Sequence, residues 1–154
     1  MIAKIHVRGR FEAARFDAPY RCAIISITDS GSDKPQFKQF CLMSEKHLLR
    51  LQFDDVDVSQ YTAADLELFD CYPMSDYHAK QIPRFLRSIE NEDLSALLIH
   101  CEAGISRSIS TAMAICDALQ WSRDVIDWKG RNVNANPPNN HVYQCVWSAF
   151  QCTP

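Results

Sequence analysis

The residue types best suited to chemistry lie in one stretch, from His100 to Ser108. Cys101 follows a short apolar run at 97–99, and five residues separate it from an Arg-Ser pair. A helical pattern begins directly afterwards, so the cysteine should lie in a loop that ends a strand and opens a helix. The backbone N–H groups of such a loop converge near the positive end of the helix dipole, which makes an anion site.

The same field favours the thiolate of Cys101, and a thiolate at this position is a nucleophile. Arg107 can close the site, because its planar fork of donors matches two phosphate oxygens. Gly104 gives the backbone freedom that a tight anion nest needs, and Ser108 can donate to the thiolate as it leaves. His100 can hold the loop open through a hydrogen bond to its backbone. The spacing therefore predicts nucleophilic attack on phosphorus. The residues expected to bind the phosphoryl oxygens are Glu102, Ala103, Gly104, Ile105, Ser106 and Arg107.

Length, composition and charge indicate the general class of protein. A chain of 154 residues, 47% of them hydrophobic, predicts a single globular domain over 1–154. The formal net charge of −3 argues against a nucleic acid or a membrane surface as the main partner. The seven cysteines are odd in number and irregularly spaced, so most should be core residues, not disulfides or zinc ligands. We see no signal peptide and no membrane-length apolar run, and therefore expect a reducing, cytoplasmic setting.

Hydrophobic periodicity predicts alternating strands and helices. The expected strands cover 2–7 (stopped by Gly9), 22–28, 48–53 and 95–99. The expected helices cover 62–70, 75–91, 107–120, a segment from Ser122 to Gly130, and 142–150. Pro83 lies inside the second of these, so that helix either starts near Pro83 or is kinked there. Residues 11–20 read as irregular, and 34–43 are ambiguous. This pattern predicts an α/β fold, with a central, mostly parallel sheet flanked by helices and the site at the carboxyl edge of a central strand.

The sequence His100-Cys101-x5-Arg107-Ser108 resembles the signature loop of the cysteine-dependent protein tyrosine phosphatases. The residues of this loop, HCEAGISRS, are most similar to those of the small dual-specificity branch, which includes compact bacterial and phage-type tyrosine phosphatases. A weaker likeness extends over roughly residues 22–150. The resemblance implies the phosphatase fold and hydrolysis of a phosphomonoester through a phosphocysteine intermediate.

The resemblance also implies an aspartate, upstream on a separate loop, that protonates the leaving oxygen and then activates water. The chemistry needs such a group, because an unprotonated alkoxide is a poor leaving group. Asp55 fits best, since it follows Phe53 in a hydrophobic-x-Asp pattern at a strand end; Asp57 is second and Asp54 third. The candidates considered are Asp54, Asp55, Asp57, Asp65, Asp70 and Asp76.

One departure from the family pattern concerns the interval before the cysteine. Asp55 and Cys101 are 46 residues apart (101 − 55), longer than is typical of the small dual-specificity enzymes. The extra length, residues 58–74, is either an insertion that shapes the pocket rim or a sign that Asp70 or Asp76 is the acid.

Asn139 has two interpretations: it caps the last helix, or, as the resemblance implies, it helps to position water or the signature loop. The side chains of the loop add no Lys and no second Arg, which favours a phosphomonoester on a protein, chiefly phosphotyrosine. We expect no cofactor and no metal, since Arg107 and the amides supply the charge, and we expect phosphate or sulfate to occupy the site. The alternatives are an enzyme with the same loop that acts on a phosphoinositide, an RNA 5′-phosphate or arsenate, and a phosphate-binding pseudophosphatase.

Overall fold

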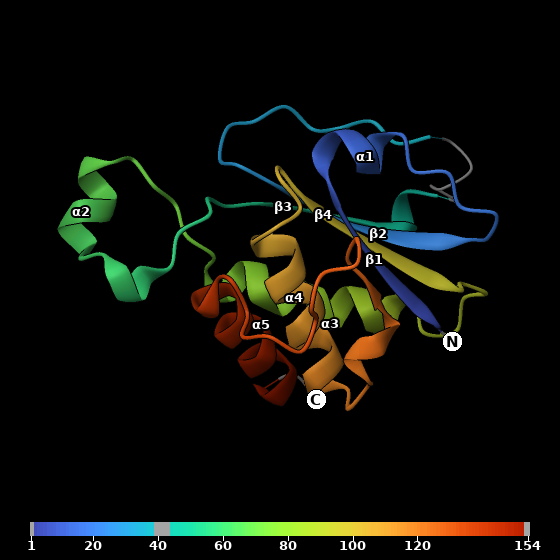
Figure 1. Cartoon of the computed structure of the whole chain (residues 1–154). Helices are drawn as coiled ribbons and strands as arrows, with labels where there is room; N and C mark the ends of the chain where they lie inside the picture. The colour runs from blue at the N-terminus through green and yellow to red at the C-terminus, as the bar shows by residue number, and fades with distance from the viewer. Residues whose placement is uncertain (1, 39–43, 153–154) are drawn as a thin grey trace.

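Five parallel strands form the centre of the protein in the order β3-β2-β4-β1-β5 (Figure 1). The computed structural model describes residues 2–38 and 44–152. The strands are β1 Lys4–Gly9, β2 Cys22–Thr28, β3 Leu48–Gln52, β4 Ala96–Cys101 and β5 Ile126–Asp127. The α-helices are α1 Arg10–Ala14, α2 Ala63–Leu68, α3 Asp76–Ser88, α4 Arg107–Ala118 and α5 Asn140–Cys152. The short 3-10 helices are η1 Glu45–His47, η2 Val58–Gln60 and η3 Arg123–Val125.

The predicted fold class is confirmed, because a parallel sheet is flanked by helices. Every residue of β2 and β4 is buried, as expected for strands covered on both faces. β4 is the middle strand of the five, so Cys101 lies at the carboxyl edge of the centre of the sheet. Polar loops that follow β2 and β3 end at the same edge, and the sheet therefore brings their side chains towards Cys101.

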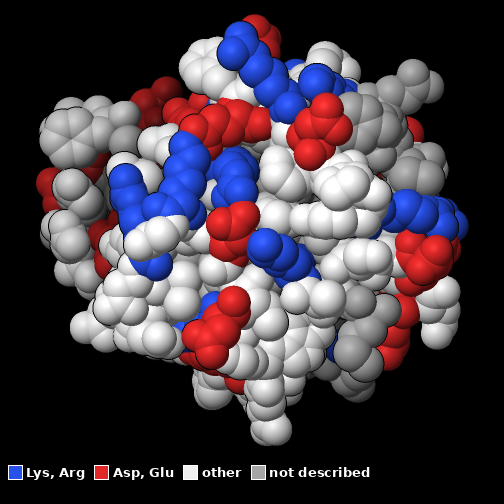
Figure 2. Space-filling model, turned by 45° about the vertical axis from the view of Figure 1, so that its right-hand side comes forward, with Lys and Arg blue, Asp and Glu red and all other residues white. Residues whose placement is uncertain are grey.

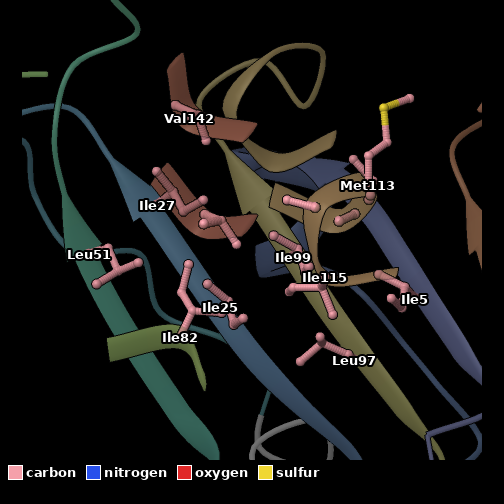
Figure 3. Packing of buried hydrophobic residues seen from close by; sticks show 14 of the residues in the cluster. Ile5, Ile25, Ile27, Leu51, Ile82, Leu97, Ile99, Met113, Ile115 and Val142 are labelled. Carbon is pink, nitrogen blue, oxygen red and sulfur yellow. The ribbon is translucent and has the colours of Figure 1, made fainter. Parts of the chain in front are cut away.

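The larger core lies between the sheet and α3, α4 and α5, which cover one of its faces (Figure 1). Figure 3 shows Ile25 and Ile99 of the sheet packed near Ile82 of α3 and Ile115 of α4. A smaller cluster on the other face includes Leu98, beneath α1. Burial of each such side chain contributes roughly 1.5–3 kcal/mol, so this packing fixes the position of α4 behind the Cys101 loop.

Two predicted features of the chain need correction. The helix expected from Ser122 to Gly130 is wrong: Ser122 caps only the short η3, and the chain then forms β5. The physical reason is tertiary, since Ile126 pairs with Ile5 of β1 at the edge of the sheet. The segment 11–20, expected to be irregular, contains most of α1, whereas β1 ends at Gly9 as predicted.

Other element predictions are confirmed with shifts of a few residues at their ends. α3 runs through Pro83 without a break, and a capping box at Ser75 begins it. α2 begins with the capping box predicted at Thr62 and Asp65. Residues 39–43 of the ambiguous segment, including Cys41, lie outside the described residues.

Within the extra length 58–74, η2 and α2 form an arm that projects from the body, whereas Met74 is buried in the core (Figure 1). Every residue of η2 and α2 is at least partly exposed, and Leu68 and Phe69 are 78% and 61% exposed. The base of the arm is fixed by Asp54, whose carboxylate accepts hydrogen bonds from the N–H of Tyr72 (2.7 Å) and of Ser30 (2.9 Å). The segment that makes up the extra length therefore begins just after Asp55, and its far end returns to the same place, where Tyr72 contacts Asp54.

The cysteines and the charged side chains are spread over the molecule. Within the described ranges the cysteines form no disulfide. Cys22 and Cys116 are core residues as expected, whereas Cys71 and Cys145 are partly exposed and Cys152 is exposed. On the face shown in Figure 2, basic side chains lie next to acidic ones. Within 2–38 and 44–152, the helices are all too short or too polar to cross a bilayer.

Candidate active site

Cys101 is the last residue of β4, and its side chain is 1% exposed. The N–H of Gly104 donates to Sγ at 3.2 Å, and the hydroxyl of Ser108 lies 3.1 Å from Sγ. Both donors stabilise negative charge on sulfur, the first through the loop backbone and the second from the first turn of α4. The sulfur therefore lies inside a loop that is shaped around it.

The loop is held from outside through its carbonyl groups. The N–H of Arg10 donates to the carbonyl of Glu102 at 3.0 Å, and the indole of Trp128 donates to the carbonyl of Gly104 at 2.8 Å. Gly104 has φ = 72°, and a Cβ there would lie 2.4 Å from the backbone nitrogen of Gly9. Only glycine can therefore occupy this position without displacing β1.

Several donors remain for an anion at this loop. Within the described part of the chain, the N–H groups of Ala103, Ile105 and Ser106 have no hydrogen-bond partner. They precede α4, a helix of 12 residues whose positive end faces the loop. Free N–H groups at a helix start are the usual protein ligands of a phosphoryl group.

Arg107 is 3% exposed and lies beneath this loop. Nη1 donates to the carbonyl of Phe53 at 2.6 Å, and Nη2 lies 2.6 Å from Asp29 Oδ1. Its buried Nε donates to no atom of the described residues, although Asp55 Oδ2 lies 3.9 Å away. The guanidinium is thus fixed by two partners while one buried donor remains for a ligand oxygen.

Asp55 is the upstream acid that the fold brings to the loop. Its Oδ1 accepts hydrogen bonds from the hydroxyl of Ser106 (2.7 Å) and from the side-chain amide of Asn139 (2.9 Å). Oδ2 faces Arg107 at 3.9 Å. Three segments that are far apart in sequence, the end of β3, the Cys101 loop and the start of α5, therefore meet at one carboxylate.

Asn139 caps α5, as one of its two interpretations predicts, and its side chain also contacts Asp55. Its Oδ1 accepts from the N–H of Val142 at 3.0 Å, which caps α5, while its amide nitrogen donates to Asp55. The backbone N–H of Asn139 also donates to Ser110 of α4 at 3.0 Å. The residue is 3% exposed, so it orients Asp55 from a rigid position.

The remaining aspartates have other partners. Asp54 fixes the base of the arm, and Asp65 is part of the capping box of α2. Asp57 caps η2. Partial burial raises the pKa of its carboxyl, but hydrogen bonds from the hydroxyl and N–H of Ser59 and from the N–H of Asn140, together with the charge of His141, leave the pKa below its usual value. A carboxyl with a lowered pKa is a poor proton donor. Asp70 accepts from the Tyr72 hydroxyl at 2.7 Å, and Asp76 lies in the first turn of α3.

His100 is fully buried, and its Nε2 lies 2.8 Å from the hydroxyl of Ser26 on β2. Nδ1 lies 3.4 Å from the carbonyl of Cys101. Burial is the main cause that lowers the pKa of His100 from 6.5 to about 4; the carbonyl of Cys101 raises it, and Arg10, Arg50 and Arg107 lower it further. The imidazole is therefore neutral at neutral pH and joins the loop backbone to the adjacent strand.

This burial predicts a pH dependence of stability. The unfolded chain binds the His100 proton near pH 6.5 and the folded chain only near 4, so stability should hold above 6.5 and fall between 6.5 and 4. The expected loss is about 2 kcal/mol between about pH 7.5 and pH 5. Urea unfolding at both pH values should show a smaller loss for His100→Gln. An equal loss in both proteins would contradict this prediction. Because each protein is compared with itself at the two pH values, the stability lost through altered packing in His100→Gln cancels.

Two site residues escaped the sequence analysis. Asp29 follows β2 and pairs with Arg107; the rule that singled out Asp55, an acid just beyond a strand, would have found it. Trp128 supports Gly104 from a segment expected to be helical, and no sequence signal separates it from the other tryptophans.

A scan against protein-family models and a search of curated proteins give no match for this chain. In the described residues, no group of three or more His, Cys, Asp or Glu side chains is arranged to hold a metal ion.

Proposed function

We propose that this protein is a phosphomonoester hydrolase, a cysteine-dependent protein tyrosine or dual-specificity phosphatase that acts through a phosphocysteine intermediate. The observation that carries the proposal is the convergence on one loop of a buried thiol, a fixed guanidinium with an unpartnered Nε, and the carboxyl group of Asp55. A nucleophile, an anion cradle and a proton donor are the parts that this reaction needs.

In the first step, the thiolate of Cys101 attacks phosphorus, a P–S bond forms and the P–O bond to the leaving group breaks. The N–H groups at 103, 105 and 106 and the guanidinium of Arg107 hold the non-bridging oxygens. Asp55 gives its proton to the leaving oxygen. Because Oδ1 is held by Ser106 and Asn139, Oδ2 is the atom that carries this proton.

In the second step, the Asp55 carboxylate takes a proton from water, and the resulting hydroxide attacks phosphorus. The P–S bond breaks and releases inorganic phosphate and the thiolate. Ser108, whose hydroxyl lies 3.1 Å from Sγ, donates to that thiolate and makes it a better leaving group. Arg107 and the amides supply the charge stabilisation, so the proposed reaction requires no metal or cofactor.

The proposed substrate is a phosphorylated protein, with phosphotyrosine favoured, and the reaction requires Cys101 to stay reduced. A reducing compartment such as the cytoplasm suits that requirement, because a reactive thiolate is readily oxidised. Kinetic constants for a phosphotyrosine peptide, a phosphoserine peptide, an inositol phosphate and an RNA 5′-phosphate test this choice. A higher kcat/KM for either of the last two would favour the alternative of a non-protein substrate.

Asp55→Asn should lower kcat by about 10²–10⁴-fold, because the leaving oxygen then departs without a proton. Phosphate binding should be retained, and one limb of the bell-shaped pH–rate profile should disappear. Asp57→Asn and Asp70→Asn are matched controls from the same acidic region, and both should keep near-normal kcat. A larger loss in either control would assign the acid elsewhere, and a flat background rate in the unmodified protein would favour the pseudophosphatase.

A further inference from the structure

A cavity of about 290 Å³ lies beside the Cys101 loop, and residues 102–105 form one of its walls. The opposite walls come from the end of β1 with the start of α1, and from residues 128–131 after β5. Its size is at the small end of the range of about 300–1,000 Å³ for ligand pockets. The cavity lies on the outer side of the loop, where Trp128 and the backbone of Arg10 donate hydrogen bonds to the loop carbonyls.

Four basic side chains and two acidic ones line this cavity. Lys129 pairs with Glu12, and Arg10 pairs with Glu102 at 3.1 Å. Asp127, just outside the lining, pairs with Arg8, so the cations exceed their acidic partners by one (4 − 3) in a chain of net charge −3. The basic residues of the lining are Arg8, Arg10, Lys129 and Arg131.

Arg131 contributes most of the available positive charge. Its guanidinium lies 5.2 Å from the centre of the Trp128 ring, and no acidic partner is found for it among the described residues. Arg8, by contrast, is held by Asp127 at 2.5 Å. A guanidinium stacked on an indole keeps its edge donors available for a carboxylate or phosphate.

These cations could not be read from the catalytic loop itself, which adds no Lys and no second Arg. β1 and the turn after β5 bring them to the loop because both strands lie on the same side of β4 in the sheet. A substrate whose phosphate lies in the loop therefore has a basic cavity next to the phosphorylated residue.

We propose that this cavity is a specificity subsite for acidic residues that flank the phosphorylated residue of a protein substrate. The inference rests on the proposed phosphatase function and adds a substrate class to it. Apolar side chains at the rim favour a peptide over a bare polyphosphate: Phe11 is 77% exposed and Ile105 46% exposed. Such surfaces bind aliphatic and aromatic parts of a peptide, while Lys129 and Arg131 bind its carboxylates.

The test compares two phosphotyrosine peptides that differ only in their flanks, one with Asp and Glu and the other with Asn and Gln. The acidic peptide should have a kcat/KM about tenfold higher at low salt, and the ratio should fall as ionic strength rises. Lys129→Ala combined with Arg131→Ala should bring the ratio close to one. Glu12→Gln removes a negative charge from the lining and should raise the ratio.

The matched control combines Lys80→Ala and Arg84→Ala, two exposed cations of α3 outside the cavity lining, and it should leave the ratio unchanged. Turnover of p-nitrophenyl phosphate separates the two hypotheses, because it requires the catalytic loop but no flanking residues. If that compound is hydrolysed and the two peptides react equally, the subsite is refuted while the phosphatase stands. Hydrolysis of an inositol polyphosphate with a higher kcat/KM than the acidic peptide would also overturn the subsite. If nothing is hydrolysed, the proposed function itself fails.

Discussion

Replacing Cys101 by serine should abolish turnover, with kcat falling by at least about 10⁴-fold, while phosphate binding is retained. A serine hydroxyl is far less acidic than a thiol, and among the described residues the side chain in contact with Sγ is the hydroxyl of Ser108, which is not a base. The Ser108 hydroxyl and the Gly104 N–H around that atom are instead arranged to stabilise an anion. Hydrolysis of p-nitrophenyl phosphate measures the loss, and calorimetric titration with inorganic phosphate measures the binding.

Cys71→Ser is the matched control for this variant, because Cys71 is a partly exposed free thiol in the arm. It should keep full activity. Acid quenching of the unmodified protein during turnover, followed by mass spectrometry, should locate the phosphoryl group on the peptide that contains Cys101. Substantial activity in Cys101→Ser, or a phosphoryl group on another residue, would rule out the phosphocysteine mechanism.

Arg107→Ala should lose both binding and turnover, with kcat/KM falling by about 10³-fold or more. Without the guanidinium, the carboxylates of Asp29 and Asp55 face an incoming dianion without compensation. Arg107→Lys should lose nearly as much, because an ammonium group cannot contact Phe53, Asp29 and a phosphate oxygen in the same geometry. Phosphate titration and steady-state kinetics measure the two effects separately.

The control for Arg107 is Arg123→Lys, which changes an arginine that pairs with Asp117 at 2.5 Å, outside the site. That variant should lose stability without losing kcat. Thermal unfolding of all three variants shows whether a loss of activity merely reflects unfolding. Phosphate affinity near that of the unmodified protein in Arg107→Ala would contradict the assigned role.

The sequence by itself predicted the fold class, and it singled out the proposed nucleophile and the loop around it. The short, β-rich apolar runs at 22–28 and 95–99 predicted strands, which the structure buries on both faces, and helical periodicity predicted the helix that begins at Arg107. These features can be predicted from short segments, because the preferred backbone dihedral angles and the period of the hydrophobic pattern depend on residues that are neighbours in the chain. The helix expected before Gly130 was wrong for the complementary reason, since pairing with β1 decides the conformation of Ile126.

Only the tertiary structure brought one aspartate out of six to the loop. Asp54, Asp55 and Asp57 are equivalent by composition, and they differ because Ser106 and Asn139 contact Asp55 alone, from elements 51 and 84 residues away. The tertiary structure likewise decides that Asp29 pairs with Arg107 and that cations line the cavity beside residues 102–105. Sequence specifies which groups can do chemistry, but their distances depend on the order of parallel strands, which is set by packing across the whole sheet.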